Sequence, residues 1–193
     1  MLANLSLKKT VLTVATLNLI YFAYEFSIAR QINSVSLFAD SVDFLEDASV
    51  NILIFLAFGW SIKTRVKLGY LFSGLLLIPG IAVLSVAWEK FQNPVSPESL
   101  TLGLTGFGAL IVNGFCAYLL ARFKKSKESL TKAAYLSARN DALANVAIIF
   151  ASVISLFWAS GWPDLIVGIG ILLLNLDSAA EVLEASRRDS ALT

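Results

Sequence analysis

Six long apolar stretches, separated by short polar segments, constrain the fold of this chain more than any other feature. A helix needs about 20 mostly apolar residues to cross the hydrocarbon core of a bilayer. Polar residues inside the first stretch, and the lack of a small-residue cleavage site after it, favour a span over a signal peptide. We therefore predict an all-α polytopic membrane protein with six transmembrane helices. The predicted spans cover approximately residues 10–29, 36–58, 68–88, 100–121, 133–159 and 163–184.

The composition supports this class and excludes others. Hydrophobic residues make up 57% of the chain and charged residues 15%, whereas roughly 25% charge is usual in soluble domains. A net charge of +1 and a single cysteine argue against a nucleic-acid partner and a disulfide scaffold. Histidine is absent, which removes the commonest general base and the commonest zinc ligand. We expect a single transmembrane domain over residues 1–193, with no cytoplasmic C-terminal domain and no tightly bound cofactor.

The basic residues predict the orientation of the chain. With a cytoplasmic N-terminus, 12 of the 15 Lys and Arg residues fall in cytoplasmic segments, only Arg30 and Lys90 fall outside, and Arg139 lies within a span. Cytoplasmic segments carry the excess of Lys and Arg, so both termini are predicted to be cytoplasmic. The basic run from Arg122 to Lys132 is interpreted as a topology signal that contacts lipid headgroups. The small size and the lack of an organelle signal favour a prokaryotic plasma (inner) membrane.

Carboxylates inside the second predicted span need an explanation. Each costs about 2.5–3.5 kcal/mol at the centre of a span, so such residues usually serve a function. At 100° per residue, the polar residues of this span form one stripe about 60° wide, with Glu46 at its edge. Three like charges on one helix face repel one another unless protons or a cation neutralise them, which indicates a metal site. The stripe consists of Ser36, Asp40, Asp43, Asp47 and Asn51.

The fifth predicted span carries a second polar group. Ser137 and Asp141 are four residues apart and share a helix face, with Asn140 and Asn145 on the same side. Arg139 points away from Asp141, and we expect it to reach the cytoplasmic surface or to pair with an acid such as Glu46. The predicted metal ligands are therefore Asp43, Asp47 and Asp141, with Ser137 or Asn140. Asp40 is expected behind these ligands or on the access route.

An all-oxygen site of this kind leaves the identity of the metal open. Such ligands suit Mg²⁺, Mn²⁺ or Ca²⁺ better than they select Zn²⁺, but a compact four-ligand cage also accepts zinc and iron(II). Carboxylates that lie close together retain protons when the site is empty, and metal binding expels them. Exchange of a divalent cation for protons therefore needs no additional machinery.

The remaining polar residues inside the spans receive weaker interpretations. Asn113 is interpreted as an interhelical hydrogen-bonding residue. Asp164 is interpreted as a charge that complements the dipole at the N-terminus of its own helix. Glu25 shares a stripe with Asn18 and Tyr21, and either pairing or an outward-facing access role fits its depth in the first span.

Three segments, in the correct order along the chain, resemble the cation diffusion facilitator (cation efflux) family. The second span of that family reads like Ser-Leu-Ala-Leu-Leu-Ala-Asp-Ala-x-His-x-x-x-Asp, with Asp often replacing His. The corresponding stretch here begins Ser36-Leu37-Phe38-Ala39-Asp40 and continues through Asp43 to Asp47. The His-x-x-x-Asp of the fifth span falls on Ser137-x-x-x-Asp141, and the start of the sixth span resembles Trp162-Pro163-Asp164.

The resemblance implies a divalent-metal/proton antiporter, usually a homodimer, that exports zinc, manganese, iron or cobalt from the cytoplasm. The replacement of the usual His by Ser137 weakens the expectation of zinc selectivity more than that of transport. The lack of the usual C-terminal domain places any dimer contact in the spans. A non-transporting metal sensor or partner subunit is the alternative. A membrane-embedded aspartyl enzyme is disfavoured, because the sequence lacks the Gly-rich cytoplasmic loop that would accompany its aspartyl pair.

Overall fold

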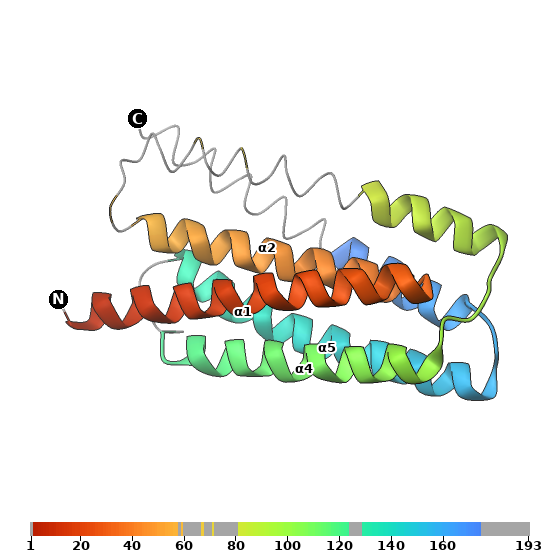
Figure 1. Cartoon of the computed structure of the whole chain (residues 1–193). Coiled ribbons are helices and arrows are strands. Elements are labelled where there is room, and N and C mark those ends of the chain that lie inside the picture. The colour runs from red at the N-terminus through yellow and green to blue at the C-terminus, as the bar shows by residue number, and fades with distance from the viewer. Residues whose placement is uncertain are drawn as a thin grey trace.

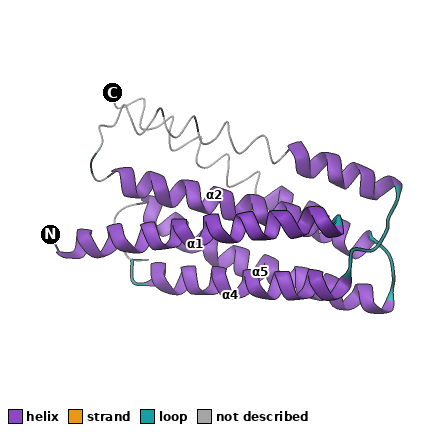
Figure 2. Cartoon of the chain, in the orientation of Figure 1, coloured by secondary structure: helices purple, strands orange, loops and turns teal. Residues whose placement is uncertain are grey.

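The computed structural model describes residues 2–57, 81–123 and 129–174, together with the single positions 59, 67 and 71. Four helices lie wholly within these residues: α1 (Leu2–Ile32), α2 (Val35–Ala57), α4 (Ser99–Ala121) and α5 (Ser129–Phe157). Two further helical segments cover 81–92 and Trp162–Leu174. The described part of the chain is helical with short connections, and it contains no strand (Figure 2). The predicted third and sixth spans extend beyond the described residues.

The four complete helices form an elongated bundle. Helices α1 and α2 form one antiparallel hairpin, and α4 and α5 form the other (Figure 1). Across the hairpins, α1 packs on α4 and α2 packs on α5, whereas α2 and α4 barely touch. The helices therefore lie around the bundle in the order α1, α2, α5, α4. This order places the polar face of α2 next to that of α5.

The outer faces of the bundle are apolar. Large hydrophobic side chains are exposed on α4 and α5, among them Leu104, Phe107, Leu143 and Phe150. A continuous apolar surface of this kind is unfavourable in water, so these faces suit contact with lipid. Among the described residues, three helices are long and apolar enough to cross a membrane: Leu7–Ile32, Ser99–Ala121 and Ala134–Phe157. Helix α2 has the length, but it carries four carboxylates in 23 residues.

The interior of the bundle is apolar at both ends and polar between them. One apolar cluster lies near the α1–α2 turn and includes Val35, Leu102 and Ile148. A second cluster lies toward the other end and includes Val11 and Leu120. Most of the buried acidic and amide side chains of α1, α2, α4 and α5 fall between these two clusters. The middle of the bundle is therefore rich in buried polar groups.

A two-residue turn joins α1 to α2. Asn33 adopts the left-handed conformation with φ 51°, which is a common way to end a helix. The Ser34 amide then donates to the carbonyl of Ala29 at 3.0 Å. The Ser34 hydroxyl accepts from the Leu37 amide at 3.2 Å and so caps α2. This local chemistry fixes where α2 begins and therefore sets the height of its carboxylates in the bundle.

The loop before α4 contains two prolines, and the helix begins after Glu98. The Glu98 carboxylate accepts from the amides of Leu100 at 3.2 Å and Thr101 at 2.9 Å. Hydrogen bonds from the Thr101 side chain and from these amides lower the pKa of Glu98. This cap satisfies amides at the start of α4 that have no partner within the helix.

Candidate metal centre

The polar stripe of α2 is buried along its whole length. Asp40 and Asn51 are fully buried, and Asp43, Asp47 and Glu46 are each at most 7% exposed. A helix that points five polar groups into a bundle needs partners for them, because unpaired buried polar groups are costly. The partners come from α1, α4, α5 and the segment Trp162–Leu174.

Asp47 lies where α1, α2 and α5 meet. Its Oδ2 accepts from the Asn18 amide group at 3.4 Å, and it also accepts from the Ser137 hydroxyl. The Asn18 side-chain oxygen in turn accepts from the Cys116 thiol at 3.5 Å. Asp47 is thus held from two neighbouring helices, and Asn18 couples it to α4.

The Ser137 hydroxyl also lies 3.5 Å from Asp141 Oδ2, so it contacts a carboxylate on α2 and one on its own helix. The carboxylate of Asp141 interacts electrostatically with that of Asp47, and the carboxylate of Asp43 with that of Asp141. The acids predicted to bind metal therefore face the same region of the bundle. Within the described residues, however, no three His, Cys, Asp or Glu side chains are gathered closely enough to hold a metal ion.

Asn140 lies apart from this group. It is exposed, and its side-chain oxygen accepts from Arg139 Nη2 at 3.3 Å. Arg139 is exposed as well, and the ion pair expected between Arg139 and an acid does not occur among the described residues. Of the two alternatives for the fourth ligand, the structure therefore brings Ser137, and not Asn140, next to the acids.

Asp40 is tied to the second hairpin through two amides. Its Oδ2 accepts from Asn145 Nδ2 at 2.6 Å, and Asn145 Oδ1 accepts from Asn113 Nδ2 at 3.1 Å. The interhelical role predicted for Asn113 is confirmed by this bond between α4 and α5. The chain of bonds fixes the orientation of both amides, so Asn145 presents its donor to Asp40.

The predicted stripe on α1 divides among three partners. Asn18 contacts Asp47, as described above, and the Tyr21 hydroxyl donates to the backbone carbonyl of Thr105 at 2.6 Å. Glu25 is fully buried, and its carboxyl group lies beside that of Asp40. Of the two interpretations left open for Glu25, pairing with another polar group is the one that matches its burial.

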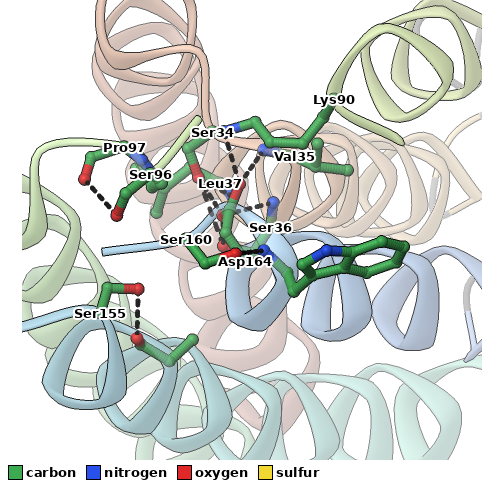
Figure 3. Close-up of polar contacts among 12 residues, drawn as sticks. Ser34, Val35, Ser36, Leu37, Lys90, Ser96, Pro97, Ser155, Ser160 and Asp164 are labelled. Carbon is green, nitrogen blue, oxygen red and sulfur yellow. Dashed lines mark hydrogen bonds and ion pairs between the residues drawn. The ribbon is translucent and has the colours of Figure 1, made fainter. Parts of the chain in front are cut away.

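Asp164 forms the most completely bonded acidic group in the described part of the chain (Figure 3). Its Oδ2 accepts from the Val35 amide at 2.8 Å and lies 3.3 Å from Lys90 Nζ. Its Oδ1 accepts from the hydroxyls of Ser34 and Ser36, each at 2.6 Å, and from the Ser36 amide at 3.1 Å. Asp164 and Lys90 are 0% and 1% exposed. We call these residues the Asp164 anchor.

The Asp164 anchor corrects one sequence-based interpretation. Asp164 was expected to complement the dipole of its own helix, but its carboxylate caps the N-terminus of α2. Lys90, which the distribution of basic residues assigned to the outer side of the membrane, is buried in an ion pair with Asp164. A close approach of backbones permits this arrangement, because a Cβ at Gly168 would lie 2.7 Å from the Val35 carbonyl carbon. None of the residues that contact Asp164 is near it in the sequence, so no local pattern could have identified them.

The fold and the buried acids define an integral, multi-pass membrane protein with a polar centre inside a helical bundle. The profile of the cation efflux transmembrane domain matches residues 11–189. The chain belongs to the cation efflux family, a family of transporters rather than enzymes.

A curated relative supports this assignment. The chain is 26% identical over 171 residues to a protein of Bacillus subtilis (strain 168), the cadmium, cobalt and zinc/H(+)-K(+) antiporter. The match covers 80% of this chain and 54% of the relative, so the chain spans about half the length of the curated protein it matches.

Proposed function

We propose that this protein exports a divalent transition-metal cation from the cytoplasm in exchange for a monovalent cation, with protons as the main counter-ion. Zinc, cobalt, manganese and iron(II) are the candidate substrates. The family assignment supports transport, and the activity for which the Bacillus subtilis relative is named supports both the metal class and the exchange. A prokaryotic inner membrane is the proposed location.

One observation carries the proposal. Ser137 contacts Asp47 on α2 and Asp141 on its own helix, α5, so one hydroxyl lies between two carboxylates that repel each other. A divalent cation would neutralise that repulsion and would replace contacts made at 3.5 Å with shorter oxygen ligation. Asp43 is the third carboxylate that interacts with Asp141. The proposed ligands are therefore Asp43, Asp47, Asp141 and Ser137, with Asn140 left outside.

The proposed mechanism follows from where these ligands lie. Asp43 and Asp47 belong to the first hairpin, whereas Ser137 and Asp141 belong to the second. Relative movement of α2 and α5 would expose the four proposed ligands first to one side of the membrane and then to the other, as in other secondary transporters. Once the metal has left, protonation of buried carboxylates in the bundle would restore charge balance, so the return step carries the counter-ion.

Two copies are proposed to work together as a homodimer formed through the spans. The outer face of α4 exposes Phe107, Ile111 and Tyr118, which suit either lipid or a second copy. Chemical crosslinking in native membranes tests this point independently of transport.

The decisive experiment is a flux assay on the purified protein in proteoliposomes. An inside-acid pH gradient drives uptake, and Zn²⁺, Co²⁺, Mn²⁺, Fe²⁺, Cd²⁺ and Mg²⁺ are tested in parallel. Asp47→Ala should abolish uptake, and Glu89→Gln, which changes an exposed carboxylate, should not. Metal binding without flux of any metal would instead favour the sensor or partner-subunit alternative.

A further inference from the structure

We propose that Glu25 and Asp40 form a second cation site, separate from the metal ligands, which holds the monovalent counter-ion. The inference rests on the proposed exchange function and adds to it the location of the exchanged ion. The site joins α1 and α2 within the first hairpin.

The first argument is that three buried carboxylate oxygens have no hydrogen-bond donor in the described part of the chain. Both Glu25 oxygens and Asp40 Oδ1 lack a hydrogen-bond partner among the described residues. Both side chains are 0% exposed, so bulk solvent does not reach their oxygens. Only Asp40 Oδ2 is satisfied, by Asn145 at 2.6 Å. Two adjacent carboxyl groups with three free acceptor oxygens need a cation between them, because an isolated buried charge is far too costly.

The second argument is that the protein supplies no cation there. Among the described residues the ion pair of Lys90 with Asp164 is the one formed, and Arg139 is exposed. The titratable groups that face the pair are Tyr21 from α1, Asp43 and Asp47 from α2, and Asp141 from α5. The Tyr21 hydroxyl is committed to the Thr105 carbonyl. All the other facing groups are acids, so they strengthen the attraction for a cation.

The third argument is position. Asp40 precedes Asp43 by one helical turn, about 4.5 Å of rise, and Asp47 by about 10 Å. The pair therefore lies between the proposed metal ligands and the end of α2 that Asp164 anchors. At this separation a divalent cation on Asp43, Asp47 and Asp141 repels a cation held by Glu25 and Asp40. Binding of the metal thus favours release of the counter-ion, which is the coupling that an exchanger requires.

The number of carboxylate oxygens without a donor favours a proton as the cation that this site holds. Two carboxyl groups can share one proton through a single short hydrogen bond, which uses two of the three free acceptors. An alkali cation would need several more oxygen ligands, and the nearby side-chain oxygen of Asn145 already accepts from Asn113. The shared chemistry is a monovalent cation, and separate ion gradients distinguish the two sources.

The test uses proteoliposomes that contain the full chain and compares wild type, Glu25→Gln and Asp40→Asn. Metal uptake down its own gradient, without a pH or potassium gradient, should remain in Glu25→Gln. Acceleration by an inside-acid gradient should fall by about tenfold or more. Loss of acceleration by an outward potassium gradient instead would support the site with an alkali cation as its occupant.

Acceleration that remains unchanged under both gradients would overturn the inference. The two substitutions lie on different helices, α1 and α2. Either variant can therefore decide the question if the other fails to fold. Metal affinity, measured by calorimetry on detergent-solubilised protein, should depend less on pH in either variant than in the wild type, because the coupling between the two sites is reciprocal. Asp47→Ala should lose metal binding itself. Absence of any metal flux from the wild type would reject the proposed function itself, a result that differs from loss of coupling alone.

Discussion

Two buried acidic centres in this bundle have the same chemistry and opposite hydrogen-bonding states. Asp164 accepts from two amides and two hydroxyls and also pairs with Lys90. Among the described residues, no amide, hydroxyl or cationic group donates to Glu25, whose carboxyl group lies beside that of Asp40, and only Asn145 donates to Asp40. A carboxylate whose acceptors are all satisfied holds helices together, whereas one with free acceptors is available to a ligand. The difference distinguishes the Asp164 anchor from the Glu25–Asp40 pair, for which we propose a ligand.

The largest expected effect is on stability, at the Asp164 anchor. Asp164→Ala should destabilise the protein by about 3–5 kcal/mol, because it leaves the Lys90 charge buried and unpaired. Thermal unfolding in detergent, followed by tryptophan fluorescence, measures the change. Lys90→Met combined with Asp164→Ala should be less destabilised than the sum of the two single variants. A fully additive double variant would contradict the assignment of the pair.

The next effect is on transport, at the proposed metal ligands. Asp47→Asn should reduce metal flux by about 100-fold or more, because it removes a charged ligand from an all-oxygen site. Its melting temperature should equal or exceed that of the wild type, since one repelling carboxylate is removed. Flux and thermal unfolding measured on the same preparation separate this centre from the Asp164 anchor. A large loss of stability in Asp47→Asn would instead place Asp47 with the structural acids.

A smaller change is expected at Ser137. Ser137→His introduces an imidazole between Asp47 and Asp141, and imidazole suits zinc better than a hydroxyl does. The affinity for Zn²⁺ relative to Mn²⁺ should rise by about tenfold, near the lower end of the effects that changes to a metal's ligand environment produce. Competition between the two metals in the flux assay provides the readout. The same substitution at Asn140, which is exposed, should leave the ratio unchanged and serves as the matched control.

The smallest effect is expected at Asn113. Its bond to Asn145 connects α4 and α5 within the bundle, and such interhelical bonds contribute about 0.6 kcal/mol on average. Asn113→Ala should therefore lower stability only slightly. Because Asn145 keeps its own bond to Asp40, metal flux should remain close to that of the wild type. A strong loss of flux would show that orientation of Asn145 matters to exchange.

Much of the architecture follows from local patterns. The length of the apolar stretches predicts the spans, and the fold class is confirmed by the helical bundle and the family match. The 100° period of a helix places Asp40, Asp43 and Asp47 on one face, and all three are buried. Such properties depend on residues within a few turns of one another, so the sequence is sufficient to predict them. The metal ligands themselves stay a prediction.

The sequence alone determined that this chain spans a membrane, approximately where its described helices lie, and that carboxylates line one face of α2. Only the tertiary structure decided which acids are satisfied and which are free. Asp164 meets Val35 across 129 positions of the chain, and Asn145 meets Asp40 across 105. Those pairings depend on the rotation and relative height of separate helices. Packing of the whole bundle sets both quantities, and no local periodicity encodes them.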